Sequence, residues 1–124
     1  MNYQYHHMGI PVTEPREGER YSPTMKMYTS GGELPLRIQW HRFEEDCPLH
    51  HLIKTKPHVA FKVDSIDEAI KGQKVLLEPY FPLEGFRVAM VEIEGAVIEF
   101  IETDLSEETI WNDKAYKNSV LYPE

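Results

Sequence analysis

The sequence is poor in cysteine, in positive charge and in long apolar runs, and each shortage excludes a class of protein. Its 124 residues include one cysteine, Cys47, so an intrachain disulfide and a cysteine-rich metal knuckle are both excluded. We expect Cys47 to be a passive buried or loop thiol. The formal net charge is −8, which makes nucleic acid and anionic membrane surfaces unsuitable partners.

Apolar segments are also short. No run approaches the ~18 residues of a membrane-spanning helix, and residues 1–5 lack the basic and apolar regions of a signal peptide. We therefore expect a cytoplasmic protein. Hydrophobic residues make up 41% of the chain, which is typical of a folded domain. A chain of this length forms one compact unit that buries roughly two-thirds of its unfolded surface.

Two segments of the chain resemble each other. His7 and His58 are each followed by apolar residues at the first, third and fifth positions: Met8, Ile10, Val12 and Val59, Phe61, Val63. The repeat divides the chain into two modules, at about 3–45 and about 57–102, followed by a tail at 103–124. Each module has a second matching piece, 38–40 in the first and 98–100 in the second.

The second module has the clearer pattern. Alternation predicts a strand at 58–63, and Ser65 with Glu68 three residues later predicts the start of a helix that stops near Gly72. Three strands in a meander should follow, at 75–80, 86–94 and 96–102, with turns at 84–85 and 94–95.

The first module should follow the same plan with an eroded helix. Strands are expected at 3–12, 25–29 and 34–43, but the helix position, 13–24, carries Pro15 and Pro23 and has no apolar periodicity. Residues 44–57 are expected to be a polar connector. In the tail, Asp104 and Glu107 form a possible helix cap. Ile110 and Trp111 could pack on the body or on a partner subunit.

Alternation along the strands places four polar side chains opposite apolar neighbours: His7, Gln39, His58 and Glu99. If the apolar faces pack against helices, these four share a pocket. Two histidines and a carboxylate hold a divalent metal with open positions, and Zn, Ni, Co, Mn or Fe(II) would suit them. Such a metal is a Lewis acid that stabilises an enediolate or enolate after proton removal from the neighbouring carbon.

Other polar residues could lie at the pocket or on the surface. His41, Lys62 and Arg37 point to the ligand side, where they could line a substrate pocket or lie at its rim. His6 should face away from His7 and be structural or on the surface. His50 and His51 should be surface residues of the connector, although they could form a lid over a substrate.

Three segments carry a resemblance to the vicinal oxygen chelate superfamily, the group of glyoxalases, bleomycin-resistance proteins and extradiol dioxygenases. They are HHMGIPV at 6–12, PHVAFKVDSIDEAI at 57–70 and GAVIEFIE at 95–102. The resemblance covers about residues 5–102. It implies an α+β fold, in which two βαβββ modules form a glyoxalase-like open barrel. It also implies a homodimer, with the site either inside one chain or shared.

Metal-dependent members of that superfamily take ligands from the first and last strand of each module. By position these are His7, Gln39, His58 and Glu99, a set similar to that of methylmalonyl-CoA epimerases. The resemblance therefore implies a metal-dependent isomerase, epimerase or lyase for a small oxygenated substrate, in which Glu99 could also act as the base. A metal-free drug-binding protein of the same fold and an Fe(II) extradiol-type dioxygenase remain alternatives.

Overall fold

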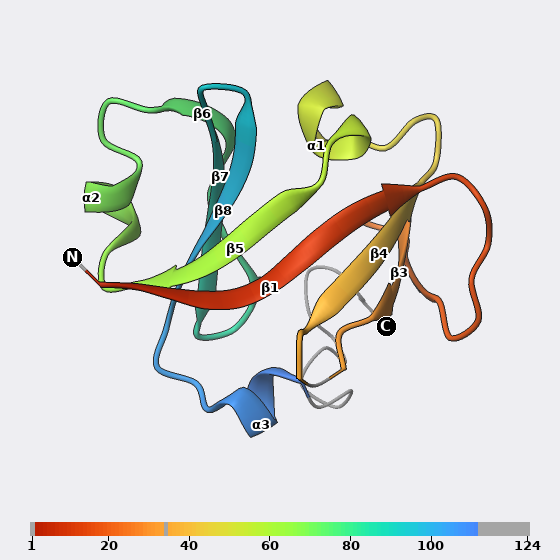
Figure 1. Ribbon diagram of the computed structural model, residues 1–124, viewed down its shortest axis with the longest axis horizontal. Helices are drawn as coiled ribbons and strands as arrows, with labels where there is room; N and C mark the ends of the chain where they lie inside the picture. Colours follow the sequence, from red (N-terminus) through yellow and green to blue (C-terminus); the bar gives the residue numbers. More distant parts are fainter. Residues whose placement is uncertain (1, 34, 112–124) are drawn as a thin grey trace.

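The computed structural model describes residues 2–33 and 35–111, which form one mixed eight-stranded sheet with three short helices (Figure 1). The strands are β1 (Tyr3–Val12), β2 (Arg20–Ser22), β3 (Met27–Gly31), β4 (Ile38–Phe43), β5 (His58–Val63), β6 (Lys74–Leu83), β7 (Phe86–Ile93) and β8 (Ala96–Thr103). The helices are α1 (His51–Thr55), α2 (Ile66–Ala69) and α3 (Glu107–Ile110).

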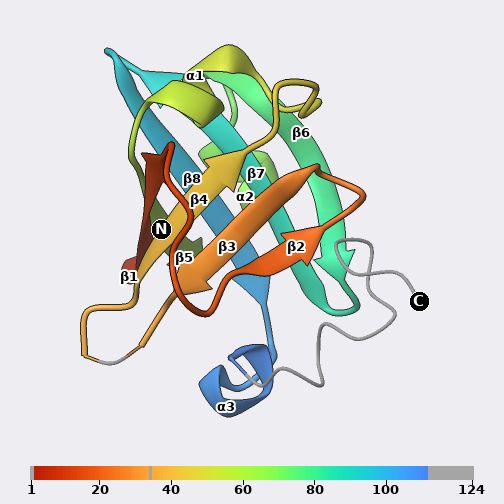
Figure 2. The ribbon, with the colours of Figure 1, turned by 90° about the vertical axis from the view of Figure 1, so that its right-hand side faces the viewer.

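The sheet order is symmetrical about the centre of the sheet. The order is β2-β3-β4-β1-β5-β8-β7-β6, so β1 and β5 lie side by side at the centre, and they run antiparallel. Outward from the centre, β4 is parallel to β1 as β8 is parallel to β5, and an antiparallel neighbour follows on each side. The sheet curls so that β3 comes to face β6 and β7 (Figure 2). The expected α+β glyoxalase-like open barrel of two modules is confirmed.

The apolar core belongs to the second half of the sheet. One cluster packs α2 against the outer face of β5, β7 and β8, and it includes Ile66, Val91 and Phe100. Two other clusters pack α1 and α3 against the same half through Ile53 and Ile110. Apart from glycines, the buried side chains of 2–33 and 35–43 are all polar: His6, His7, Ser22, Ser30 and His41.

Local sequence features set the start of α2 and the turn between β7 and β8. Ser65 Oγ accepts a hydrogen bond from the Glu68 backbone N–H at 3.3 Å, which confirms the predicted start of α2. Glu94 and Gly95 both have positive φ, 48° and 91°, and they connect β7 to β8. This geometry suits a tight hairpin because both central residues of that turn type need positive φ.

The structure corrects three expectations in the first half and the connector. The loop 13–24 contains β2, whose three residues are too few to show a period. β4 begins at Ile38 rather than Leu34, because Arg37 has a φ of 55°, which lies outside the extended range of strand backbone. Leu34 lies outside the described residues. The connector contains α1, which the His50 side chain caps by accepting from the Leu52 N–H.

The beginning of the tail belongs to the body of its own chain. Ser106, not Asp104, caps α3 by accepting from the Thr109 N–H. Ile110 is 2% exposed and packs in a cluster with Phe86 and Ile101.

Cys47 is buried, as expected. Within the described ranges, no helix has the length and apolar character needed to cross a membrane.

The packing of α3 predicts a stability effect. Replacing Ile110 with alanine should lower the free energy of unfolding by about 2–4 kcal/mol, because it leaves a cavity in a closed apolar cluster. Urea unfolding measures the change. Leu36→Ala is the control, since Leu36 is 62% exposed and its loss should cost less than about 0.5 kcal/mol. Equal effects of the two substitutions would contradict the docking of α3 on the body.

Candidate metal centre

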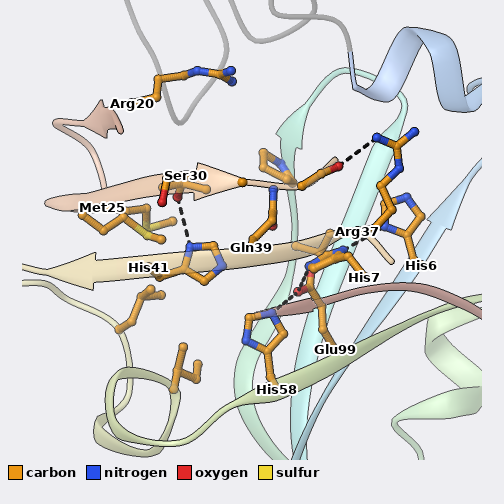
Figure 3. Close-up of a pocket in the computed structure, with 18 of the residues that line it drawn as sticks. His6, His7, Arg20, Met25, Ser30, Arg37, Gln39, His41, His58 and Glu99 are labelled. Carbon is orange, nitrogen blue, oxygen red and sulfur yellow. Dashed lines mark hydrogen bonds and ion pairs between the residues drawn. The ribbon is translucent and has the colours of Figure 1, made fainter. Parts of the chain in front are cut away.

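A cavity of about 470 Å³ lies inside the curled sheet, between its two halves (Figure 3). Its polar lining comes from several strands and includes His6, His7, Ser30, Gln39, His41, His58 and Glu99. Its apolar wall comes mainly from β6 and β7, through residues such as Leu77, Tyr80 and Val88. Space of this size is typical of small-molecule sites.

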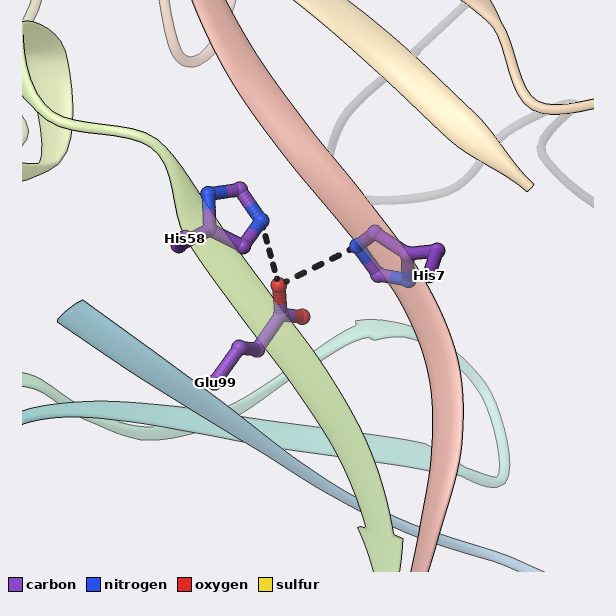
Figure 4. A group of neighbouring side chains, drawn as sticks. All are labelled: His7, His58 and Glu99. Carbon is purple, nitrogen blue, oxygen red and sulfur yellow. Dashed lines mark ion pairs between the residues drawn. The ribbon is translucent and has the colours of Figure 1, made fainter. Parts of the chain in front are cut away.

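Three candidate ligands meet at one end of the cavity, and all three come from one chain. Oε1 of Glu99 lies 3.4 Å from Nε2 of His7 and 3.1 Å from Nε2 of His58 (Figure 4). Each residue offers a ligand atom within 4.8 Å of the others. The sheet register brings them together, since His58 pairs with Gly9, two residues from His7, and Ala60 of the same strand pairs with Glu99.

The donor atoms fit a divalent cation. Nε2 of His58 is buried and has no hydrogen-bond partner of acceptable geometry, although the Glu99 carboxylate is close. A buried nitrogen without a partner costs free energy. A cation bound between the three side chains would satisfy this nitrogen, the His7 nitrogen and the carboxylate together. Two imidazoles and a carboxylate are also a chemically suitable set for a divalent transition metal.

Electrostatics keep Glu99 in the ionised form that a ligand needs. Burial raises the pKa of its carboxyl, but the close approach and charges of His7 and His58 outweigh burial. The net effect holds the pKa of Glu99 well below its usual range. While it lies between the two histidines, this carboxylate is therefore a weak base.

Gly9 makes room for the His58 ring. A Cβ atom built at position 9 would lie 2.1 Å from Cε1 of His58 and 2.6 Å from its Nε2. The backbone of Gly9 does not have a positive φ, so glycine is needed here for space rather than for conformation. The pairing of Gly9 with His58 across β1 and β5 places the ring over this gap.

His6 lies in the cavity wall, contrary to the expectation that it faces away from His7. In the β1–β5 register Tyr5 pairs with Phe61 and His7 with Ala60, so His6 is an extra residue in a β-bulge. A bulge breaks the period of two, and both histidines can then face one side. His6 is 4% exposed, and its Nδ1 lies 2.8 Å from Nδ1 of His7. Burial and the neighbouring His7 lower its pKa, against the opposing effect of Glu107.

His41 lies in the cavity next to His58. The two rings are stacked, with centroids 5.6 Å apart. Nδ1 of His41 shares a hydrogen bond with Thr29 Oγ1 at 3.0 Å, while its Nε2 is buried and has no partner. Burial, followed by the charges of His58 and His7, lowers the pKa of His41 to about 3, so the ring is neutral at pH 7.

Some of the remaining predicted site residues line the cavity and others do not. Gln39 and Arg37 line the cavity. Arg37 donates to the Gly32 carbonyl at 2.8 Å and lies over the Trp111 ring. Lys62 is not among the lining residues, because four residues of strand carry it roughly 13 Å beyond His58. His50 and His51 are exposed, as expected, and do not line the cavity.

Sequence reasoning missed His6, Ser30 and Trp111 as lining residues. The paired histidines at 6 and 7 were the available signal for His6, but a regular strand would separate them onto opposite faces. Ser30 and Trp111 follow no local pattern, since their place depends on the curl of the sheet and on the packing of α3.

Comparisons with known proteins support the fold. No family model matches the sequence, and no curated protein matches it significantly. Among solved structures, a hypothetical protein from Bacillus halodurans is similar with a TM-score of 0.65 and 22% identity, over 87% of this chain and 99% of that one. Methylmalonyl-CoA epimerase from Mycobacterium tuberculosis is similar with a TM-score of 0.58 and 16% identity, over 82% and 89%. These likenesses show a vicinal oxygen chelate-like fold.

The close approach of Gly9 and the His58 ring predicts that the stability effects of substitutions at positions 9 and 58 are coupled. Gly9→Ala should lower the free energy of unfolding by about 1–3 kcal/mol, because the added methyl overlaps the His58 ring. In the double variant with His58→Ala, the cost of the position 9 change should be largely relieved. A thermodynamic cycle from denaturant unfolding measures this coupling. Strictly additive effects would contradict the close approach.

The buried His41 predicts an acid-sensitive fold. Its pKa is about 3 in the folded protein and near the ordinary 6.5 in the unfolded chain, so the unfolded chain binds the extra proton between these values. Stability should fall as the pH drops from 6.5. His41→Phe should make this fall shallower by about 1.4 kcal/mol per pH unit. Urea unfolding from pH 6.5 to 4.5 provides the slopes, with His51→Phe as control; equal slopes for wild type and His41→Phe would refute the assignment.

Proposed function

We propose that this protein is a metal-dependent enzyme that catalyses a proton-transfer isomerisation, epimerisation or lyase reaction on a small oxygenated substrate. The observation that carries the proposal is the convergence of His7, His58 and Glu99 at a cavity, with a buried His58 nitrogen that lacks a partner. The fold shared with methylmalonyl-CoA epimerase supports the same class of reaction.

In this proposal His7, His58 and Glu99 hold the metal, and Gln39 supplies a fourth ligand from the same cavity wall. A bound divalent ion would stabilise the negative charge that develops when a proton leaves the carbon beside a carbonyl group. The open cavity leaves space for the substrate oxygens next to the three ligands. Zn, Ni, Co, Mn and Fe(II) all remain compatible with these donors.

Glu99 is also the proposed proton acceptor. Its low pKa depends on contact with His7 and His58, so it is a poor base in the position seen here. Rotation of the carboxylate away from the two histidines would remove the interactions that lower its pKa. Burial would then raise its basicity, which is the condition for accepting a substrate proton.

The cavity also offers hydrogen-bonding groups for the rest of a substrate. Nε2 of His41 and Oγ of Ser30 are both buried without partners, and both residues line the cavity. Buried polar atoms of this kind are usually satisfied, so we propose that a polar substrate group contacts them. Arg37 places a positive charge at the same cavity and could neutralise an acidic substrate.

Metal analysis tests the ligand set directly. Protein purified without an affinity tag, reloaded with zinc or nickel and desalted, should hold one ion per chain. His58→Ala and Glu99→Ala should lose it, because each removes one of three ligands. His51→Ala is the matched control and should retain the ion, since His51 is an exposed histidine outside the cavity. A wild-type protein without bound metal, or unchanged content in His58→Ala, would remove the proposal.

Exchange of substrate protons separates the reaction classes. With a panel of α-hydroxycarbonyl compounds and acyl thioesters, the metal-loaded protein should move solvent deuterium onto the carbon beside the carbonyl, as followed by NMR. His58→Ala should not. Oxygen uptake with catechols on the Fe(II)-loaded protein would instead support the dioxygenase alternative, which the same two-histidine, one-carboxylate set allows. Ligand binding without either activity would support a binding protein.

A further inference from the structure

The bulge in β1 gives the proposed metal centre an outer row of partners: Glu107, His6 and Trp111. We propose that His6, held by Glu107 and Trp111, is a positioning residue that keeps the proton of His7 on Nδ1 and leaves Nε2 free to bind the metal. This inference rests on the proposed function. It assigns a role in the site to the first turn of the tail.

The two histidines are in direct contact through their rings. Nδ1 of His6 and Nδ1 of His7 lie 2.8 Å apart, so one nitrogen must donate a proton and the other must accept it. Nε2 of His7 faces Glu99 and is the proposed ligand atom. A ligand nitrogen carries no proton, so a neutral His7 must carry its proton on Nδ1. Nδ1 of His6 is then the acceptor.

The proton position of His6 follows from that of His7. Because its Nδ1 accepts, a neutral His6 must carry its proton on Nε2, and this atom lies 3.3 Å from Oε2 of Glu107. The two atoms are not aligned as a hydrogen bond, so the carboxylate acts mainly through its charge. A carboxylate beside this nitrogen favours the tautomer with a proton there. The positions of both protons therefore follow from the single assignment of His7 as a ligand.

The orientation of the His6 ring is set by Trp111. It stacks on the Trp111 ring, with centroids 5.3 Å apart and an angle of 18° between the planes. Trp111 also meets His7 edge-on at 6.1 Å. The preceding residue, Ile110, is buried in the core and anchors α3 to the body of the protein. The imidazole of His6 is thus held in one orientation, with one nitrogen toward His7 (Figure 3) and the other toward Glu107.

Two substitutions at position 6 separate positioning from space filling. His6→Phe keeps an aromatic ring for stacking on Trp111 but offers no acceptor to His7. His6→Asn loses the ring but keeps an oxygen close to the place of Nδ1. If His6 only filled space, phenylalanine would be the better replacement. If it positions the His7 proton, asparagine should be better.

The proton of His7 can be read in the zinc-loaded protein, because without metal the Glu99 carboxylate also favours a proton on Nε2 of His7. Nitrogen-15 NMR of the histidine rings should show a His7 Nδ1 proton that is hydrogen-bonded and exchanges slowly with water in the wild type and in His6→Asn, and fast exchange of this proton in His6→Phe. His51→Phe is the control and should leave the His7 signal unchanged. A wild-type His7 that binds zinc through Nδ1, or an equally slow exchange in His6→Phe, would overturn the inference.

Zinc affinity, measured by competition with a chelator, provides the second readout. His6→Phe should bind zinc about 10–100-fold more weakly, the usual cost of losing a partner behind a ligand. His6→Asn should bind with close to wild-type affinity, and Glu107→Gln should lose less than His6→Phe. Wild-type affinity in His6→Phe would overturn the positioning role alone, whereas absence of zinc binding in the wild type would overturn the proposed function.

Discussion

The pairing of β1 with β5 is the constraint on which the rest of the structure depends. These two strands join the halves of the sheet, and their register sets Gly9 opposite His58 and His7 opposite Ala60. The parallel pairing of β5 with β8 then brings Glu99 beside Ala60. The candidate ligands are thus placed by backbone hydrogen bonds of three adjacent strands, which is a rigid support for a site.

The two halves of the sheet differ in what they bury. The second half carries the three apolar clusters and the contacts of all three helices, so it supplies most of the hydrophobic stabilisation. The first half buries histidines and serines instead, and these face the cavity. No helix follows β1 among the described residues, which is consistent with this division because those residues of the first half form no buried apolar cluster that a helix would cover. The cavity therefore combines polar side chains of the first half with a fold that is stabilised mainly by the apolar packing of the second half.

Much of this arrangement can be predicted from the sequence, and the exceptions have physical causes. Alternation places His58 and Glu99 on the inner faces of their strands, and Ser65 marks the start of α2, because these signals are local and regular. His6 could not be placed because a single inserted residue reverses the facing of a strand. The position of Lys62 depends on how far the cavity extends along β5, which only the curl of the sheet determines.

The most direct test of the central claim is a crystal structure of the zinc- or nickel-loaded protein, with anomalous scattering used to locate the ion. We expect one strong peak per chain between Nε2 of His7, Nε2 of His58 and the Glu99 carboxylate, at distances of about 2.0–2.2 Å for zinc. A peak only at exposed residues such as His50 and His51, or no peak in the cavity of a fully loaded crystal, would contradict it.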